Sequence, residues 1–131
     1  MKLIVCLDDR GGMTFMKRRQ SRDRVQIEDM AKLIFGSTLA VSPYTEPLVL
    51  DSGINYTVCE NPAIAKRDYC FIENTPLPDI AEIDGVVIYR WGRHYPSDVK
   101  FTADLGAFSL DSVYEFRGSS HEKITREIYK L

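Results

Sequence analysis

Two apolar runs constrain the fold of this chain more than any other feature. Residues 2–7 read KLIVCL and residues 85–91 read GVVIYRW. Neither run alternates between apolar and polar residues, as a strand with one wet face would. Continuous apolar runs of this length are typical of central strands covered on both faces, which occur mostly in α/β proteins. The runs therefore predict a sheet with other elements packed on both of its faces.

A helix is predicted between these runs. Ser21 can cap it, and Asp23 in its first turn is favourably placed against the helix dipole. Four apolar residues then recur at helical spacing, Ile27, Met30, Ala31 and Ile34. Residues 37–47 are rich in turn residues, and their prolines limit any helix there to a turn or two. Strands are predicted at 48–50, 56–59, 68–72, 99–101 and 112–116, with one short helix within 73–84.

The C-terminal segment carries two conflicting patterns. Ser119 and Glu122 have the spacing of a helix capping box, and Ile124, Ile128 and Leu131 recur at helical spacing. Residues 124–129 are nevertheless rich in β-branched and aromatic side chains, and a turn-forming RGSS follows a strong strand pattern. We predict a hairpin of 110–117 with 122–131. The fold class is then α/β in one domain, 1–131: a mixed, mainly parallel sheet flanked by few helices, with a C-terminal antiparallel hairpin.

Composition excludes several function classes. The chain has 17 Lys and Arg against 19 Asp and Glu, so wholesale attraction to nucleic acid or to anionic membrane is not expected. No apolar run approaches the ~20 residues of a membrane span, and the N-terminal run is too short for a signal peptide. Cys6, Cys59 and Cys70 are odd in number and widely spaced, which predicts buried thiols. We expect a cytoplasmic protein with no metal and no membrane association.

A cationic segment is the first candidate site. Lys17, Arg18 and Arg19, with Arg22 and Arg24 close behind, could neutralise phosphates. A cationic run this short is more often a solvated connection into a helix. We predict an exposed, mobile loop over 9–20, held to the core by Phe15 or Met16.

A second candidate lies at the end of the 85–91 run. Trp91, Arg93 and His94 place aromatic rings beside guanidinium groups, an arrangement that can stack a base and hold its phosphate. The alternative is structural, with Trp91 covering the core. Ser119, Ser120 and His121 are more simply a turn, because adjacent Ser and His do not by themselves make a nucleophile and its base.

The chain resembles dihydrofolate reductases at both ends. KLIVCLDDRGGM is similar to their first strand and following loop, and residues 86–116 are similar to their C-terminal third. The resemblance implies their fold, and makes Asp23 the stand-in for the carboxylate that anchors folate. Members of this family place a Gly-Gly pair after the central strand for the cofactor pyrophosphate, whereas residues 71–78 here read FIENTPLP. A carboxylate and two prolines oppose that contact, so nicotinamide hydride transfer and its cofactor are not expected.

The chain also resembles short bacterial proteins that are sometimes labelled ribonuclease Z. The resemblance rests on KRRQS at 17–21 and GSSHEKIT at 118–125. Ribonuclease Z itself uses a histidine-rich dinuclear zinc site, and a chain with only His94 and His121 cannot reproduce it. No residue is carried over from this resemblance.

The leading functional hypothesis is binding of a small anionic ligand, with nucleotides as one class that would qualify. The ligand would lie between the 9–24 segment and the first helix and contact Asp23, Lys17, Arg18 and Arg19, with Trp91, Arg93 and His94 less central. RNA association or ribonuclease activity is the first alternative, and a protein–protein interaction module is the second. Whether the chain is an enzyme, and its oligomeric state, are left open.

Overall fold

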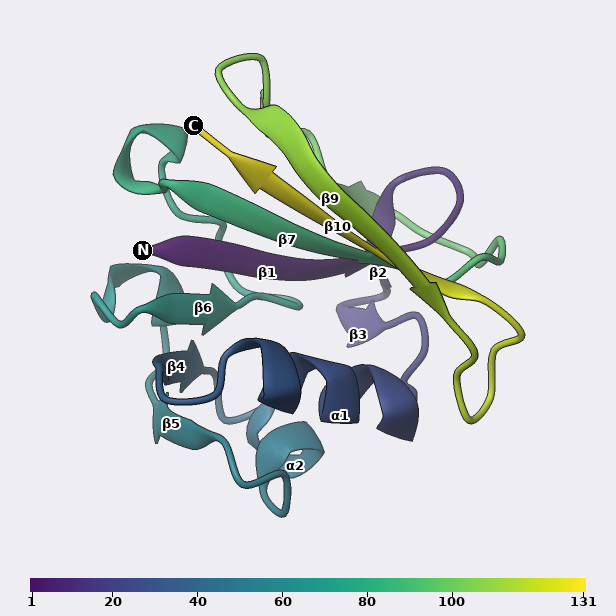
Figure 1. Cartoon of the computed structure of the whole chain (residues 1–131), viewed down its shortest axis with the longest axis horizontal. Coiled ribbons are helices and arrows are strands. Elements are labelled where there is room, and N and C mark those ends of the chain that lie inside the picture. Colours follow the sequence, from purple (N-terminus) through teal and green to yellow (C-terminus); the bar gives the residue numbers. More distant parts are fainter.

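The computed structural model describes all residues, 1–131. Seven strands form the main sheet in the order β5-β4-β6-β1-β7-β10-β9 (Figure 1). The first five run parallel to one another, and β10 is antiparallel to both β7 and β9. These strands are β1 (Lys2–Leu7), β4 (Thr38–Val41), β5 (Asn55–Val58), β6 (Tyr69–Phe71), β7 (Gly85–Arg90), β9 (Ser109–Phe116) and β10 (Ile124–Lys130). The predicted fold class is confirmed.

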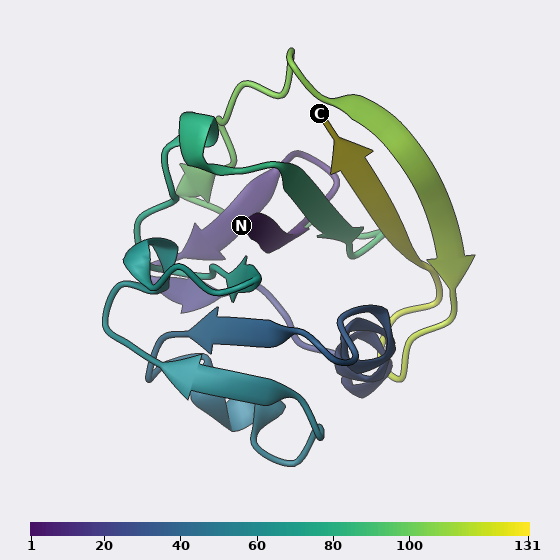
Figure 2. The ribbon, with the colours of Figure 1, turned by 60° about the vertical axis from the view of Figure 1, so that its left-hand side comes forward.

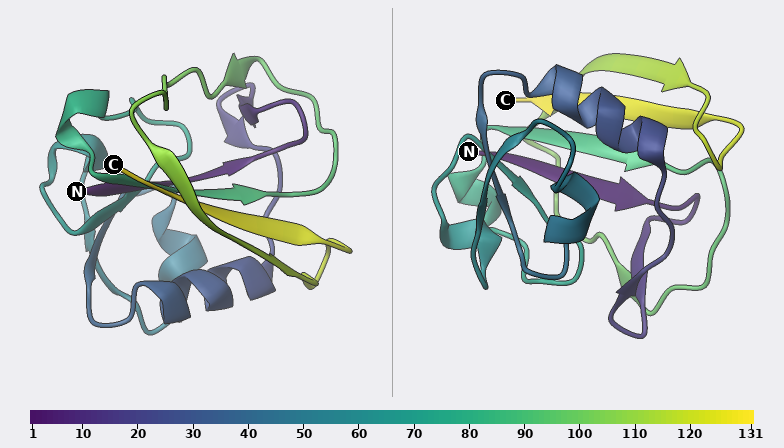
Figure 3. Two further views of the ribbon diagram at one scale, coloured as in Figure 1. Left: turned by 45° about the horizontal axis from the view of Figure 1, so that its top comes forward. Right: turned by 90° about the horizontal axis from the view of Figure 1, so that it is seen from below.

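Short elements surround this sheet. A three-stranded sheet lies beyond the carboxyl end of β1, and α1 lies across one face of the main sheet (Figure 3). The small sheet contains β2 (Gly12–Phe15), β3 (Arg18–Arg19) and β8 (Val99–Lys100). The helices are α1 (Arg24–Leu33), α2 (Glu46–Val49) and the 3₁₀ turns η1 (Pro62–Ile64) and η2 (Ile80–Glu82), the last within the predicted helical segment.

The core has two layers, one on each face of the main sheet. Leu3 and Val5 of β1 are fully buried in one layer, beneath the 3₁₀ turns and the 101–108 segment. Ile4 points to the other face and packs in one cluster with Met30 and Ile34 at the α1 side. Successive residues of a strand point to opposite faces, so a strand covered twice must be apolar throughout. The KLIVCL run is such a strand.

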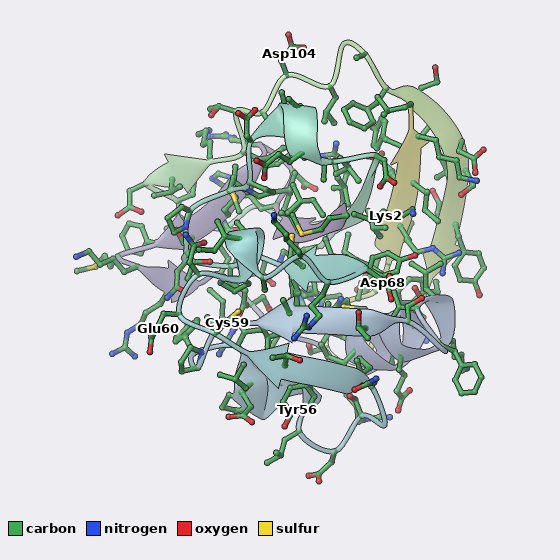
Figure 4. The ribbon with its side chains drawn as sticks, turned by 90° about the vertical axis from the view of Figure 1, so that its left-hand side faces the viewer. Lys2, Tyr56, Cys59, Glu60, Asp68 and Asp104 are labelled. Atoms are coloured by element: carbon green, nitrogen blue, oxygen red, sulfur yellow. The ribbon has the colours of Figure 1, made fainter.

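The parallel strands are held together at the ends where they begin. The backbone N–H of Lys2 donates to the carbonyl of Asp68, 2.9 Å away, and the two residues lie side by side in Figure 4. The Asp68 carboxylate accepts from the backbone N–H of Thr38 at 2.8 Å. A residue just before β6 thus connects β1 with β4.

The C-terminal strand is confirmed. Residues Thr125 to Lys130 of β10 pair with β7, and β10 also pairs with β9 along its length. A strand at this position gains backbone partners on both sides, whereas a short terminal helix would need an apolar face to pack against. Helical spacing in 124–131 was outweighed by this pairing.

Three local predictions are wrong. Ser21 is not the helix cap, because Asp23 is extended and its side chain accepts the first N–H groups of α1. Thr38–Val41, placed in a turn-rich segment, is a strand in the middle of the parallel sheet. The 48–50 strand is instead part of α2, which has a proline in its first turn. Pairing with neighbouring strands makes Thr38–Val41 a strand, and Pro47 favours the start of α2.

The 9–20 segment is also more regular than predicted. It forms the β2–β3 hairpin, with Met16 and Lys17 at its tip in left-handed backbone conformation. Neither Phe15, 42% exposed, nor Met16, 70% exposed, holds it to the core. Buried Met13 does so, in the layer that contains Leu3.

Candidate functional site

A buried carboxylate is the centre of the most organised polar cluster in the molecule. Asp23 is 2% exposed and caps α1. The turn between β9 and β10 reaches the beginning of α1 (Figure 2) and brings a second set of donors to this carboxylate. Its oxygens accept from the backbone N–H groups of Val25, Gln26, Ser119 and Ser120, at 2.9, 3.3, 2.9 and 2.8 Å.

Burial alone would raise the pKa of Asp23. The hydrogen bonds from His121 and from these backbone N–H groups outweigh it and lower that pKa well below its usual value. Gly118 permits the approach, since a Cβ there would collide with the Asp23 carboxylate. Asp23 is therefore an ionised carboxylate whose oxygens are already taken up by this chain.

His121 is the partner that fixes the chemistry of the cluster. Its Nδ1 lies 2.8 Å from Oδ2 of Asp23, and its side chain is 1% exposed. An ionised carboxylate can only accept, so Nδ1 carries a proton, and in the neutral form of the ring Nε2 is an acceptor. The ring stacks on Trp91, with centroids 4.7 Å apart and planes 20° apart. Position, orientation and tautomer of this imidazole are thus all set.

Two hydroxyl groups face the free nitrogen of His121. Nε2 lies 3.0 Å from Oγ of Ser21 and 2.9 Å from Oη of Tyr95. Tyr95 is held in turn by buried Asp8, whose carboxylate accepts its backbone N–H at 3.0 Å. The same carboxylate accepts from Arg10 and Gly12 and so closes the loop after β1.

A groove of about 640 Å³ lies on the other side of Asp23, between α1, α2 and the β9–β10 turn. Ile27, Pro47 and Leu48 supply its apolar wall. Its polar lining includes the exposed cations Arg22 and Arg24, the acids Glu28 and Asp51, and the hydroxyls of Ser52, Ser119 and Ser120. Arg24 is paired with Glu28 at 2.7 Å on the surface, and Arg22 has no carboxylate partner.

Arg19 is engaged in a second, separate cluster. Its Nε and Nη2 each donate to the carboxylate of Glu73 at 2.9 Å, and its guanidinium lies over the Tyr44 ring, 4.2 Å from the centroid. Thr45, at the start of α2, donates its hydroxyl to Glu73 at 2.7 Å. The pair joins the β2–β3 hairpin, the end of β6 and the start of α2.

Of the remaining predicted site residues, only Trp91 belongs to one of the two clusters. Lys17 and Arg18 are exposed at the hairpin tip, where the Lys17 carbonyl accepts from Asn74 at 3.0 Å. Arg93 is exposed, and His94 is 54% exposed with Nδ1 3.7 Å from Asp8. Trp91 is buried under His121 rather than open to a ligand. The seven predicted residues do not form one site.

Comparison with solved structures identifies the architecture. Dihydrofolate reductase from Enterococcus faecalis, complexed with NADP(H) and RAB-propyl, superposes on 98% of this chain and 94% of its own with a TM-score of 0.64. The fold is that of dihydrofolate reductases. Sequence identity over the match is 11%. At this identity the structural match shows the fold and says nothing about activity. No protein-family model matches the chain, and neither does any curated protein sequence.

The resemblance to proteins labelled ribonuclease Z finds no support. No group of three or more His, Cys, Asp and Glu side chains is arranged to hold a metal ion. No helix is long and apolar enough to cross a membrane.

The roles of two residues in these clusters were not predicted from the sequence. His121 was interpreted as part of a turn, and Glu73 was noted only as an obstacle to pyrophosphate. Their partners lie 98 and 54 positions away in the chain. The one local signal was Gly118, whose missing side chain allows the turn to reach Asp23.

Proposed function

We propose that the protein binds a small anionic ligand, such as a nucleotide, in the groove between α1, α2 and the β9–β10 turn, without nicotinamide redox chemistry. The groove itself carries the proposal. At about 640 Å³ it is within the range of small-molecule sites, and it places the apolar side chains of Ile27 and Leu48 beside two exposed guanidinium groups. In this proposal the ligand still lies between the 9–24 segment and α1, but it contacts Arg22 and Arg24 in place of Lys17, Arg18 and Arg19.

Two guanidinium groups, which line the groove beside the acids Glu28 and Asp51, are the groups that would hold an anionic ligand. Arg22 lines it without an ion pair, and the surface pair between Arg24 and Glu28 is weak enough for a phosphate to compete with it. Guanidinium groups bind phosphate through two parallel hydrogen bonds. The hydroxyls of Ser119 and Ser120 at the same end donate to the Asp23 carboxylate, so the guanidinium groups are the donors left for a ligand. Asp23 is excluded as a ligand contact because its oxygens are already satisfied.

The absence of nicotinamide chemistry in this proposal is supported by the Arg19–Glu73 pair. The resemblance to dihydrofolate reductases implies that the cofactor pyrophosphate lies where Glu73 follows β6. The side chain of Glu73 is 8% exposed and paired with Arg19 and Thr45. Its negative charge would repel a pyrophosphate, and the pair fills the space in front of the start of α2. These residues do not fit the dinucleotide.

Matched pairs of charge-neutralising substitutions test the proposal. Arg22→Gln with Arg24→Gln should weaken binding of ATP or AMP at low salt at least about tenfold, as loss of charge-assisted hydrogen bonds predicts. Lys17→Gln with Arg18→Gln removes the same charge from the hairpin tip and should leave the affinity unchanged. Calorimetry on both variants measures this. Equal losses in both, or no binding by the native protein, would refute the groove as the site.

RNA binding is the second candidate, and the hairpin tip favours it. Phe15 and Met16 are exposed there beside Lys17 and Arg18. Aromatic and cationic side chains together can stack a base and neutralise its phosphate. A short single-stranded RNA whose affinity falls in the Lys17, Arg18 variant but not in the groove variant would establish this function in place of the first.

A further inference from the structure

We propose that Ser21, His121 and Asp23 form a nucleophilic centre that transfers the acyl group of a small ester to Ser21 and then to water. The three side chains come from the segment before α1 and from the β9–β10 turn, and they stand in one chain of hydrogen bonds. Of the three residues, Asp23 alone also lines the groove, and the proposed function assigns it no ligand contact.

The imidazole has the requirements of a general base. A base must carry its proton on the far nitrogen, be held in place, and present a free lone pair to the nucleophile. Asp23, 2.8 Å from Nδ1, keeps the proton on that nitrogen, and the stacked Trp91 ring holds the imidazole in place. Nε2 then presents its lone pair to Ser21 Oγ at 3.0 Å, within the distance for proton transfer.

Ser21 is the hydroxyl that can reach a substrate as an alcohol nucleophile. It is half-buried, and no backbone group of the chain accepts its hydroxyl. The other hydroxyl at Nε2 belongs to Tyr95, which also lies 3.4 Å from Ser21 Oγ and can donate to it. With the Tyr95 proton directed to Ser21, the Ser21 proton is left to Nε2.

The reaction balances on these groups alone. Ser21 Oγ attacks the ester carbonyl carbon while its proton moves to Nε2, and a tetrahedral intermediate forms. The bond to the leaving oxygen then breaks, and that oxygen takes the proton from Nε2. Water repeats the sequence on the acyl-Ser21, which releases the carboxylic acid and restores both groups. Asp23 remains a carboxylate throughout and acts as a positioning residue that stabilises the imidazolium.

The space beside Ser21 limits the substrate. A hollow lined in part by Arg19, Gln20, Ser21 and Trp91 measures about 10 Å³, room for about one water molecule. Formyl and acetyl are the smallest acyl groups and come nearest to that size. The geometry therefore points to short-chain esters, with acetate esters as the probe, and longer acyl chains should react more slowly.

Acetylation by p-nitrophenyl acetate tests the centre directly. The native protein should release p-nitrophenol and, after acid quenching, carry the acetyl group on the peptide that contains Ser21. Ser21→Ala and His121→Gln should each slow the release at least about 100-fold, the usual contribution of a general base. Ser109→Ala, an exposed serine of β9, is the matched control and should react as the native protein does. p-Nitrophenyl butyrate should react more slowly than the acetate.

Three results would overturn the proposal. The first is full activity in Ser21→Ala together with an inactive His121→Gln, which would assign the reaction to the imidazole itself. The second is an acetyl group found on Tyr95. The third is a folded native protein that releases p-nitrophenol no faster than free imidazole does. Melting curves establish that the His121→Gln variant is folded. ATP or AMP binding in the groove is measured separately, so either proposal can fail without the other.

Discussion

At the scale of single residues, Asp23 shows how one side chain can hold distant segments together. It caps α1 through Val25 and Gln26, and it accepts two N–H groups from the β9–β10 turn 96 and 97 positions later. A buried carboxylate is stable only when its oxygens are satisfied, and here backbone amides and an imidazole satisfy them. The same contacts keep it ionised, which the His121 tautomer requires.

Replacing Asp23 tests that electrostatic role. Asp23→Asn keeps a good helix cap but removes the charge, so we expect a loss of roughly 2 kcal/mol in unfolding free energy at neutral pH. The folded-state pKa lies below the unfolded value of 3.8, so this stabilisation is present above pH 3.8 and is lost as pH falls below it. The free energy of unfolding, measured with urea, should therefore fall less steeply from pH 7 to pH 3 in Asp23→Asn than in the native protein. Exposed Asp9→Asn is the control; parallel curves for Asp23→Asn and the native protein would contradict the assignment.

At the scale of elements, the Arg19–Glu73 pair decides how the β2–β3 hairpin sits on the sheet. Arg19 also receives support from Tyr44, whose hydroxyl accepts its backbone N–H at 2.9 Å and whose carbonyl accepts from its guanidinium at 3.1 Å. The hairpin segment, β6 and α2 meet at this point. A segment predicted to be a mobile loop is thereby fixed across the carboxyl end of the sheet.

A double-mutant cycle measures this coupling. Arg19→Met leaves Glu73 buried without its partner and should lower the free energy of unfolding by roughly 3 kcal/mol. This value is near the low end for a buried pair because 21% of the Arg19 side chain is exposed. Glu73→Gln should cost a similar amount. The double variant should lose clearly less than the sum, since neither charge is then left alone. Additive losses in urea unfolding would show that the two side chains act independently.

At the scale of the whole molecule, the chain shares the architecture of a dihydrofolate reductase to which it is only 11% identical. Core residues on both faces of β1 and β7 are apolar, which preserves the sheet. Near the carboxyl end of the sheet, the side chains of Arg19, Glu73 and Thr45 bind one another. A shared fold does not by itself imply a shared activity.

NADPH provides the test at this scale. The protein should show no NADPH-dependent rise in melting temperature and no dihydrofolate reduction, because Glu73 and Arg19 fill the space that a pyrophosphate would need. A ligand at a hundredfold excess over its dissociation constant would stabilise the fold by about 2.7 kcal/mol, which a melting curve detects readily. AMP serves as the comparison, since the groove should accept it without nicotinamide. A clear rise with NADPH and none with AMP would reverse both conclusions.

The sequence by itself determined the sheet and its layers. The KLIVCL and GVVIYRW runs predicted central strands, and the β-branched C-terminus predicted the hairpin, because burial on two faces and pairing on two sides leave periodic, local traces in the sequence. Thr38–Val41 was missed because its neighbours are turn residues, and only pairing with β5 and β6 makes it a strand.

Only the tertiary structure decided the site. Asp23 meets His121, and Arg19 meets Glu73, through contacts between segments far apart in the chain. The sequence shows which of these side chains are charged, but charge alone does not say which ones are paired, buried or free. Asp23 was predicted to anchor a ligand and Arg19 to contact a phosphate, but both side chains bind other side chains of the same chain. Which polar groups remain for a ligand depends on three-dimensional proximity, and no short-range pattern encodes that.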